Sequence, residues 1–280
     1  MKENIVKAFA PANISCIFKV YKHKNPRLAG SWGLGFTLSE GVVVSVKKTN
    51  ATSVLFNGKK VDMPTVFDVV RALTARNILI TINTKLPLGC GFGLSGAAAL
   101  ATAYAVNKLL DLKNPKKELA IIAHTAEVKN KTGLGDVANQ FFGGVIFKKK
   151  PSSSFSVIKI PLKEKAVYSR VFSPLSTKNV LSNSKLLVHI DKAAKEALGE
   201  MANVLSEKNV LTLSRILSIS KQFAKDSGLL QEEDVIRAIE EVEKKGGNAT
   251  MIMLGNAVVS NIPFSDAAKF FLSQKRAMIL

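Results

Sequence analysis

Glycines crowd one short segment of the sequence, residues 89–96, which reads Gly-Cys-Gly-Phe-Gly-Leu-Ser-Gly. The segment lies between an alternating apolar stretch and a long Ala-rich stretch, so it predicts a turn from a strand into a helix. The free N–H groups of such a turn and the dipole of the following helix favour a bound anion. Glycine lets phosphate oxygens approach the backbone closely. The structural alternative is a tight turn that only packs the helix against a sheet.

Two common phosphate-binding patterns are excluded by the context of this turn. Gly91-x-Gly93-x-x-Gly96 satisfies the dinucleotide fingerprint. However, the preceding strand alternates, no second parallel strand follows the helix, and Asp111 comes too early to bind a ribose. No Gly-Lys-Ser/Thr sequence follows, which excludes a Walker A loop, and the protein-kinase motifs are absent.

The elements around the turn predict an α+β fold with two lobes, since strands and helices do not alternate strictly. The first lobe is predicted to contain strands over 4–10, 14–20, 41–47, 53–56, 78–83 and 145–149, with helices over 65–76, from the turn to about 110, and over 117–129. The second is predicted to contain strands over 155–160 and 185–190, about three helices between 192 and 245, two strands around 251–259, and a final helix over 265–274. The Lys-Pro-Ser-Ser-Ser sequence at 150–154 predicts a boundary between domains 1–150 and 151–280.

Composition narrows the class of partner. The 280 residues include 40 Lys and Arg against 21 Asp and Glu, a net charge of +19 that attracts anions. The basic residues are scattered, including the triplet 148–150, and aromatic residues make up only 7%, so we expect solvated surface lysines and no nucleic-acid partner. Cys16 and Cys90 form no metal-binding pattern with the three histidines. No signal peptide or membrane span is expected, because the longest apolar stretch, 94–106, is too short, and a cytoplasmic location is predicted.

The glycine-rich segment, extended to Pro87 and Ala98, resembles the phosphate-binding motif PxxxGLGSSAA of the GHMP kinases. Ser95 matches the second Ser of the motif, whereas Phe92, Leu94 and Gly96 replace Leu, the first Ser and Ala. The departures, and the segments 10–15, 30–35, 132–137 with Gly143-Gly144, and 251–256, resemble the archaeal pantoate kinase branch of that family. The resemblance extends over essentially the whole chain. It implies a ribosomal-S5-like N-terminal domain, a ferredoxin-like C-terminal domain, and ATP-dependent phosphorylation of the terminal hydroxyl of pantoate in coenzyme A biosynthesis.

The resemblance also assigns residues to the two cofactors, ATP and Mg²⁺. Ser95 and Glu127 match the family's metal-binding pair, and Asp136 matches its catalytic aspartate. From the sequence alone, Ser95 suits a helix N-cap, Glu127 a solvated helix face, and Asp136 a helix cap. ATP would be bound by the segment that carries the motif, namely Pro87, Gly89, Gly91, Phe92, Gly93, Leu94, Ser95, Gly96 and Ala97.

Pantoate is predicted to contact residues near the catalytic aspartate. Asn13 replaces a lysine that several GHMP kinases carry, so Asn13 and Ser15 become hydrogen-bonding candidates, with ordinary turn chemistry as the alternative. Arg27 is the predicted clamp for the carboxylate, because a guanidinium binds carboxylates through two parallel bonds; a surface charge is its alternative. The remaining residues predicted to bind pantoate are Ser31, Thr132 and Gly133. No role is assigned to His124.

Two other functions stay open. One is a GHMP kinase for another small hydroxy acid or alcohol, such as homoserine, mevalonate or shikimate. The other is a basic nucleic-acid-binding protein, because RNA-associated proteins share the S5-like lobe; this reading would require neither Glu127 with Asp136 nor a glycine cradle. A homodimer is compatible with each of these two functions and with phosphorylation of pantoate.

Overall fold

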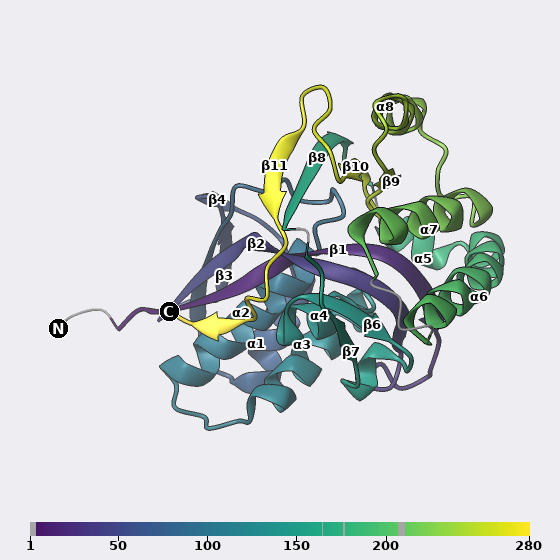
Figure 1. Cartoon of the computed structure of the whole chain (residues 1–280). Helices are drawn as coiled ribbons and strands as arrows, with labels where there is room; N and C mark the ends of the chain where they lie inside the picture. Colours follow the sequence, from purple (N-terminus) through teal and green to yellow (C-terminus); the bar gives the residue numbers. More distant parts are fainter. Residues whose placement is uncertain (1–3, 164, 176, 207–210) are drawn as a thin grey trace.

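The computed structural model describes residues 4–163, 165–175, 177–206 and 211–280, which form two lobes, each built on its own sheet (Figure 1). The first sheet is centred on a long antiparallel hairpin of β1 (Val6–Tyr21) and β2 (Gly30–Lys48). Two predicted strands, 4–10 and 14–20, are one strand in the structure, because β1 continues through a bulge between Pro11 and Asn13. Bulges re-aim side chains, and Asn13 and Ser15 lie beside this one.

The rest of the first sheet assembles on β2. Along the path the order is β12-β1-β2-β5-β3-β4, and β6, which also pairs with β7, joins the other half of β2. The strands are β3 (Ser53–Phe56), β4 (Lys59–Lys60), β5 (Ile78–Asn83), β6 (Val145–Lys148), β7 (Ile158–Ile160) and β12 (Met278–Ile279).

One face of this sheet is covered by α1 (Pro64–Leu73), α2 (Leu94–Leu109), α3 (Lys116–Asn130) and α4 (Asp136–Phe142) (Figure 1). The central helix is α2, and its alanines at 97–99, 101, 103 and 105 are fully buried. Their small side chains let α2 lie close to both the hairpin and α3, which carries Glu127. The helix that follows the glycine-rich turn is therefore anchored rigidly.

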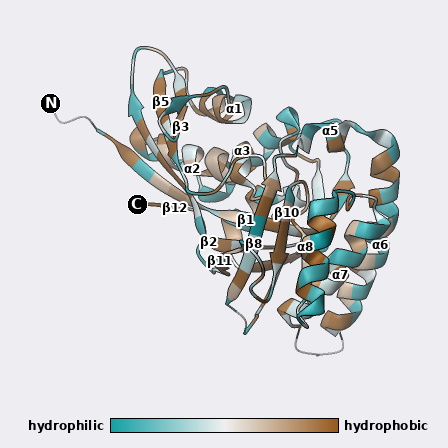
Figure 2. Ribbon diagram, turned by 90° about the horizontal axis from the view of Figure 1, so that it is seen from above, coloured by the Kyte–Doolittle hydropathy of each residue, from teal (hydrophilic) through white to brown (hydrophobic). Residues whose placement is uncertain are grey.

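The second lobe has a four-stranded antiparallel sheet of order β11-β8-β10-β9. Its strands are β8 (Ala166–Ser173), β9 (Ala249–Met251), β10 (Asn256–Ser260) and β11 (Ala268–Phe271). The helices α5 (Thr177–Ser182), α6 (Ser184–Ser206), α7 (Leu213–Asp226) and α8 (Glu233–Lys244) flank it. The single turn η1 (Ser152–Ser154) lies between β6 and β7 of the first sheet. The mixed brown and teal of α6 to α8 in Figure 2 matches their amphipathic sequences.

Two predicted elements of the second lobe are wrong. Residues 185–190 belong to α6, because the apolar positions Leu187, Ile190, Ala194 and Met201 repeat at helical spacing and are buried along one face. Residues 265–274 do not form a helix but contain β11, which pairs with β8. In 185–190 the helical period was mistaken for a strand, whereas in 265–274 pairing with β8 overrides the local preference for a helix.

The two sheets do not divide the sequence in simple halves. The division at residue 150 stays a prediction, and both β7 and the C-terminal β12 lie in the first sheet (Figure 1). Cys16 and Cys90 are free and buried. No helix within the described ranges is long and apolar enough to cross a membrane.

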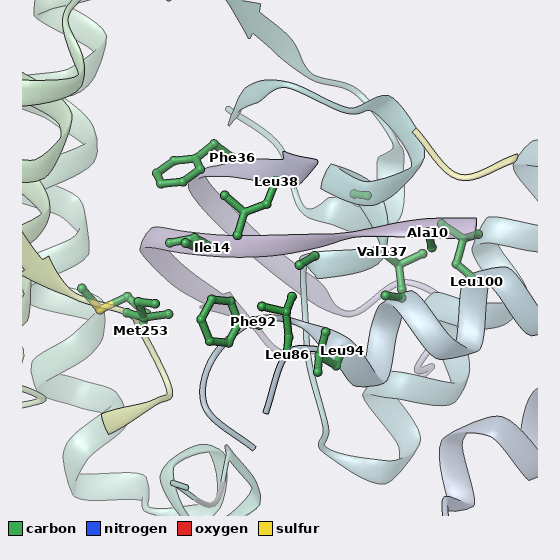
Figure 3. Packing of buried hydrophobic residues seen from close by; sticks show 14 of the residues in the cluster. Ala10, Ile14, Phe36, Leu38, Leu86, Phe92, Leu94, Leu100, Val137 and Met253 are labelled. Atoms are coloured by element: carbon green, nitrogen blue, oxygen red, sulfur yellow. The ribbon is translucent and has the colours of Figure 1, made fainter. Parts of the chain in front are cut away.

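The lobes meet at the glycine-rich turn. Figure 3 shows Phe92 near Met253 of the second lobe, with Leu86 and Leu94 nearby, and all four belong to one buried apolar cluster. Met253 N also donates a hydrogen bond to the backbone oxygen of Ser15, at 3.3 Å. Contacts with the second lobe therefore fix the glycine-rich turn relative to β1.

Candidate active site

The glycine-rich turn has the backbone geometry that its composition predicts. Gly89, Gly91 and Gly93 adopt φ values of 78°, 85° and 61°, a region that side chains rarely occupy. A Cβ on Gly91 would lie 2.6 Å from Cγ2 of Ile252, so the second lobe also requires glycine there. Helix α2 begins at Leu94, and its N-cap Gly93 provides no side-chain cap. The exposed N–H groups and the helix dipole are therefore available to an anion.

A cavity of about 460 Å³ opens at this turn. Its residues come from β1, the start of α1, the turn, the α3–α4 loop and the second lobe. They are Ser15, Asp62, Met63, Pro64, Thr65, Leu88, Gly89, Gly91, Phe92, Gly93, Leu94, Ser95, Asn130, Lys131, Thr132, Asp136, Leu175, Thr177, Lys178, Met253 and Leu254. A lining that combines apolar side chains with hydroxyl, carboxylate and backbone groups is typical of a small-molecule site.

Glu127 is a buried carboxylate behind the cavity, bonded to two residues that line it, Ser95 and Thr132. It lies late in α3, is 1% exposed, and accepts hydrogen bonds from the hydroxyls of Ser95 and Thr132, the latter at 3.1 Å. Burial, with the nearby carboxylate of Asp136, raises the pKa of Glu127 to about 8. The solvated-face alternative for Glu127 therefore does not hold, and Ser95 is the second residue of α2 and not its N-cap.

Asp136 is the first residue of α4, whose N-cap is Gly135. One carboxylate oxygen, Oδ1, accepts hydrogen bonds from Asn13 Nδ2 at 2.6 Å and from Ser15 Oγ at 3.3 Å. Burial raises the pKa of Asp136, while the bonds from Asn13 and Ser15 and the charge of Lys148 oppose that rise. The carboxylate therefore belongs to a side-chain network at the cavity, beyond any capping role.

A chain of hydrogen bonds joins this carboxylate to a buried lysine. Lys148 Nζ donates to Asn139 Oδ1 at 2.9 Å, Asn139 Nδ2 donates to Asn13 Oδ1 at 2.8 Å, and Asn13 Nδ2 donates to Asp136. Every donor points from the cation toward the carboxylate, so the bonds polarise one another in the same direction. Burial lowers the pKa of Lys148 to about 8, against the opposing attraction of Asp136.

Side-chain oxygens of a kind that suits magnesium come from Glu127, Asp136 and Gln140. A Cβ on Gly133 would lie 2.5 Å from Glu127 Oε2 and 3.0 Å from Asp136 Oδ2, so the two carboxylates flank that glycine. Gln140 Oε1 is buried and has no hydrogen-bond donor in the described part of the chain. Mg²⁺ is usually held by one or two carboxylates together with phosphates and water. The described residues contain no cluster of three or more His, Cys, Asp or Glu, and the sparse oxygen set fits Mg²⁺ bound with a nucleotide.

Comparisons with known proteins show the family to which this chain belongs. The family model described as the GHMP kinases N terminal domain matches residues 64–144. A pantoate kinase of Methanospirillum hungatei is 30% identical over 262 residues, which cover 90% of this chain and 86% of that protein. A pantoate kinase of Methanocaldococcus jannaschii is 32% identical over 255 residues, which cover 89% and 90%. The chain belongs to the pantoate kinase family of GHMP kinases.

A solved structure supports the same placement. It is described as a phosphotransferase related to the CoA biosynthesis pathway, and it matches with a TM-score of 0.83 and 26% identity over 99% of this chain and 98% of its own. The GHMP fold predicted from the sequence is thereby confirmed. Membership of the pantoate kinase family makes this chain an ATP-dependent kinase.

Several residues predicted from the family motifs meet at the cavity. Asn13, Ser15, Asp136, Ser95, Glu127, Thr132 and Gly133 lie in it or directly behind it. Gly96 and Ala97 are buried in α2 beneath the turn, and Pro87 is exposed outside the lining. Ser31 is 3% exposed and does not line the cavity, and its backbone N–H donates to Ser152 Oγ at 3.0 Å.

Arg27 is placed differently from the expectation. Its guanidinium donates two hydrogen bonds to Glu118, at 2.9 and 2.8 Å, on the outside of the first lobe, and Arg27 does not line the cavity. The bidentate geometry is present, but the carboxylate that it binds belongs to the protein. His124 is buried, and its Nε2 lies 2.8 Å from the backbone oxygen of Ala29, so it positions the start of β2.

Sequence reasoning missed three residues of the site. Lys148 was counted with the surface triplet 148–150, yet it ends a wholly buried strand and is 4% exposed. Asn139 and Gln140 follow Asp136 at helical spacings of three and four, which place all three on one face of α4. A polar pair at that spacing within an otherwise apolar helix was the signal that could have revealed them.

Proposed function

We propose that this protein transfers the γ-phosphoryl group of ATP to the terminal hydroxyl of pantoate, giving 4-phosphopantoate and ADP in an Mg²⁺-dependent reaction. The observation that carries the proposal is the Asp136 carboxylate, fixed by Asn13 within the cavity that the glycine-rich turn opens. The named function of two relatives that are about 30% identical supports the choice of pantoate.

The glycine-rich turn provides the phosphate site. Its three left-handed glycines and the uncapped start of α2 offer N–H groups to the phosphates, and Ser95 with Glu127 would hold Mg²⁺ beside them. The metal, when bound, would neutralise charge on the phosphates. Lys131 and Lys178 are cations in the lining that add to the attraction.

Asp136 accepts the proton of the attacking hydroxyl. Oδ1 is taken by Asn13 and Ser15, which leaves Oδ2, on the Gly133 side, for the substrate. A primary hydroxyl is a weak nucleophile at neutral pH, so a carboxylate that orients the hydroxyl and takes its proton lowers the barrier. The oxygen then attacks the γ-phosphorus, and the bond to the β-phosphate oxygen breaks with ADP as leaving group.

A small-molecule panel tests the proposal. The purified protein is incubated with Mg-ATP and pantoate, mevalonate, homoserine or shikimate, and the phosphorylated product is identified by ³¹P NMR. We expect phosphorylation of pantoate with the highest kcat/KM. Preference for another acceptor would assign a different GHMP kinase activity, and phosphorylation of none would leave the nucleic-acid alternative to be tested by binding. The cytoplasmic location and the homodimer stay predictions that this experiment does not test.

A further inference from the structure

Gln140 has an unusual position for a buried amide. It lies on α4, is 0% exposed, and its Nε2 donates a hydrogen bond to the backbone oxygen of Gly93 at 2.8 Å. A carbonyl oxygen can only accept, so this bond fixes which end of the amide faces the turn. The other end, Oε1, is therefore held pointing away from Gly93, and no described residue donates to it.

The orphaned oxygen faces the carboxylate of Glu127 across Gly96. A Cβ on Gly96 would lie 2.7 Å from Glu127 Oε2 and 3.0 Å from Gln140 Oε1, so both oxygens crowd the same face of that glycine. The GHMP motif usually has alanine at this position. Glycine in this chain thus leaves room for two oxygens where the usual motif would place a methyl group.

The two oxygens face one glycine, and no other described group donates to Gln140 Oε1, so either a proton on Glu127 or a bound cation that replaces this proton would satisfy both oxygens. A buried acceptor left without a partner costs free energy, and amide and carboxylate oxygens are both hard ligands of the kind that Mg²⁺ prefers. Gln140 Nε2 also ties the amide to the turn that would bind the phosphates. A cation bound here would contact a side chain of α4 and would lie beside the turn that we propose binds the phosphates.

We propose that Gln140 Oε1 is a further ligand, directly or through one water, of the divalent cation that accompanies the nucleotide, beside Glu127. The inference rests on the proposed use of Mg-ATP and is independent of the acceptor alcohol. The proposed cation site thus has a neutral oxygen in addition to Ser95 and Glu127. This oxygen has room because residue 96 is glycine.

The test measures metal binding directly, without turnover and without pantoate. Mn²⁺ is titrated into the protein–ADP complex and the free ion is followed by EPR, and ADP binding is measured separately by calorimetry in EDTA. For Gln140→Met we expect the Mn²⁺ affinity to fall by about tenfold or more, a typical loss around metal sites. The ADP affinity in EDTA should stay within about twofold of wild type, since the backbone N–H groups that bind phosphate are unchanged.

Gln140→Glu separates the oxygen from the amide nitrogen. This variant keeps an oxygen ligand and loses the bond to Gly93, so the Mn²⁺ affinity should equal or exceed that of wild type. Ser169→Ala is the matched control, because Ser169 Oγ is another buried orphan, on β8 and outside the cavity lining. It should leave both affinities unchanged.

Three results would overturn the proposal. One is a Gln140→Met variant with the Mn²⁺ affinity of wild type. Another is equal loss of Mn²⁺ and metal-free ADP affinity, which would show that the amide acts only as a brace for the turn. The last concerns a second variant, Gly96→Ala, which is used if Gln140→Met fails to fold. Its added methyl group crowds the same two oxygens, so an unchanged Mn²⁺ affinity in this variant would also contradict the proposal. A failure of pantoate phosphorylation would not affect any of these measurements.

Discussion

Asn13 Nδ2 donates to Asp136 Oδ1 at 2.6 Å, across 123 positions of sequence. The bond joins the bulge of β1 to the first residue of α4, so it fixes the carboxylate relative to the central sheet. In several GHMP kinases a lysine stands where this chain has Asn13. Here the positive charge comes from Lys148, which reaches Asp136 through Asn139 and Asn13.

Asp136→Asn should lose at least about a hundredfold in kcat, because a general base typically contributes 10²–10⁴ in rate. The amide keeps the size of the side chain but cannot take the proton of the hydroxyl. We expect the affinity for ATP, measured by calorimetry, to stay near that of wild type. Asp62→Asn is the matched control, since Asp62 also lines the cavity but lies at its exposed rim. Single-turnover kcat above a tenth of wild type would place the base elsewhere.

Lys148→Met should shift the pH dependence of kcat/KM. The positive charge of Lys148 lowers the pKa of Asp136, so its removal lets that pKa rise. Asp136 must be ionised to accept a proton, and the acid limb of the profile should therefore move to higher pH. Lys149→Met, one residue along and exposed, should leave the limb where it is. Coincident profiles for wild type and both variants would show that the charge of Lys148 does not act on the Asp136 carboxylate.

The sequence predicts the parts of this site that carry a local signature. The turn over 89–96 is dense in glycine, and the Ala-rich helix after it can pack only in a core, so both are confirmed. The predicted GHMP fold is also confirmed, because each motif that implies it is a short run of consecutive residues that can be recognised in the sequence.

Contacts that depend on folding at long range were not predictable. Lys148 is set in the core by the pairing of β6 with both β2 and β7, and its own neighbours Lys149 and Lys150 look identical in sequence but are exposed. Arg27 meets Glu118 only because the β1–β2 connection passes the start of α3. No spacing along the chain encodes either contact.

Arg27→Ala should have little effect on catalysis. Its partner is Glu118, and an exposed ion pair contributes about 1 kcal/mol or less to stability. Because Arg27 does not line the cavity, we expect the KM for pantoate and the KM for ATP each to stay within about twofold of wild type. Glu118→Ala, which breaks the same pair from the other side, should behave alike. A tenfold rise in the KM for pantoate, in Arg27→Ala alone, would restore the carboxylate-clamp role.

Ionic strength should affect capture of the substrates more than the chemical step. The net charge of +19 attracts anionic pantoate and ATP over distances that salt screens. We expect kcat/KM for pantoate to fall between low and physiological salt, while kcat stays nearly constant. Initial rates at fixed pH across a sodium chloride series measure both. A constant kcat/KM would show that the positive charge does not steer the substrate.

Glu127→Gln should change how stability depends on pH. The folded-state pKa of Glu127, about 8, lies above its ordinary value of 4.5, so between these values the folded protein holds a proton that the unfolded chain has released. The contribution of Glu127 to the free energy of unfolding of the wild type should therefore fall as pH rises from about 5 to 8. Glutamine has no proton to lose, so the variant should lack this fall and gain stability relative to wild type as pH increases.

Chemical denaturation in EDTA at several pH values from 5 to 8 measures the effect without a metal that competes for the carboxylate. The range stops at 8 because Lys148 has the opposite sign above it: its folded pKa of about 8 lies below the ordinary 10.5, so its contribution rises with pH there. Glu240→Gln, an exposed glutamate on α8, should follow the wild-type curve. Parallel curves for Glu127→Gln and wild type would mean that burial does not raise the pKa of this carboxyl, and that Glu127 is charged before any cation binds.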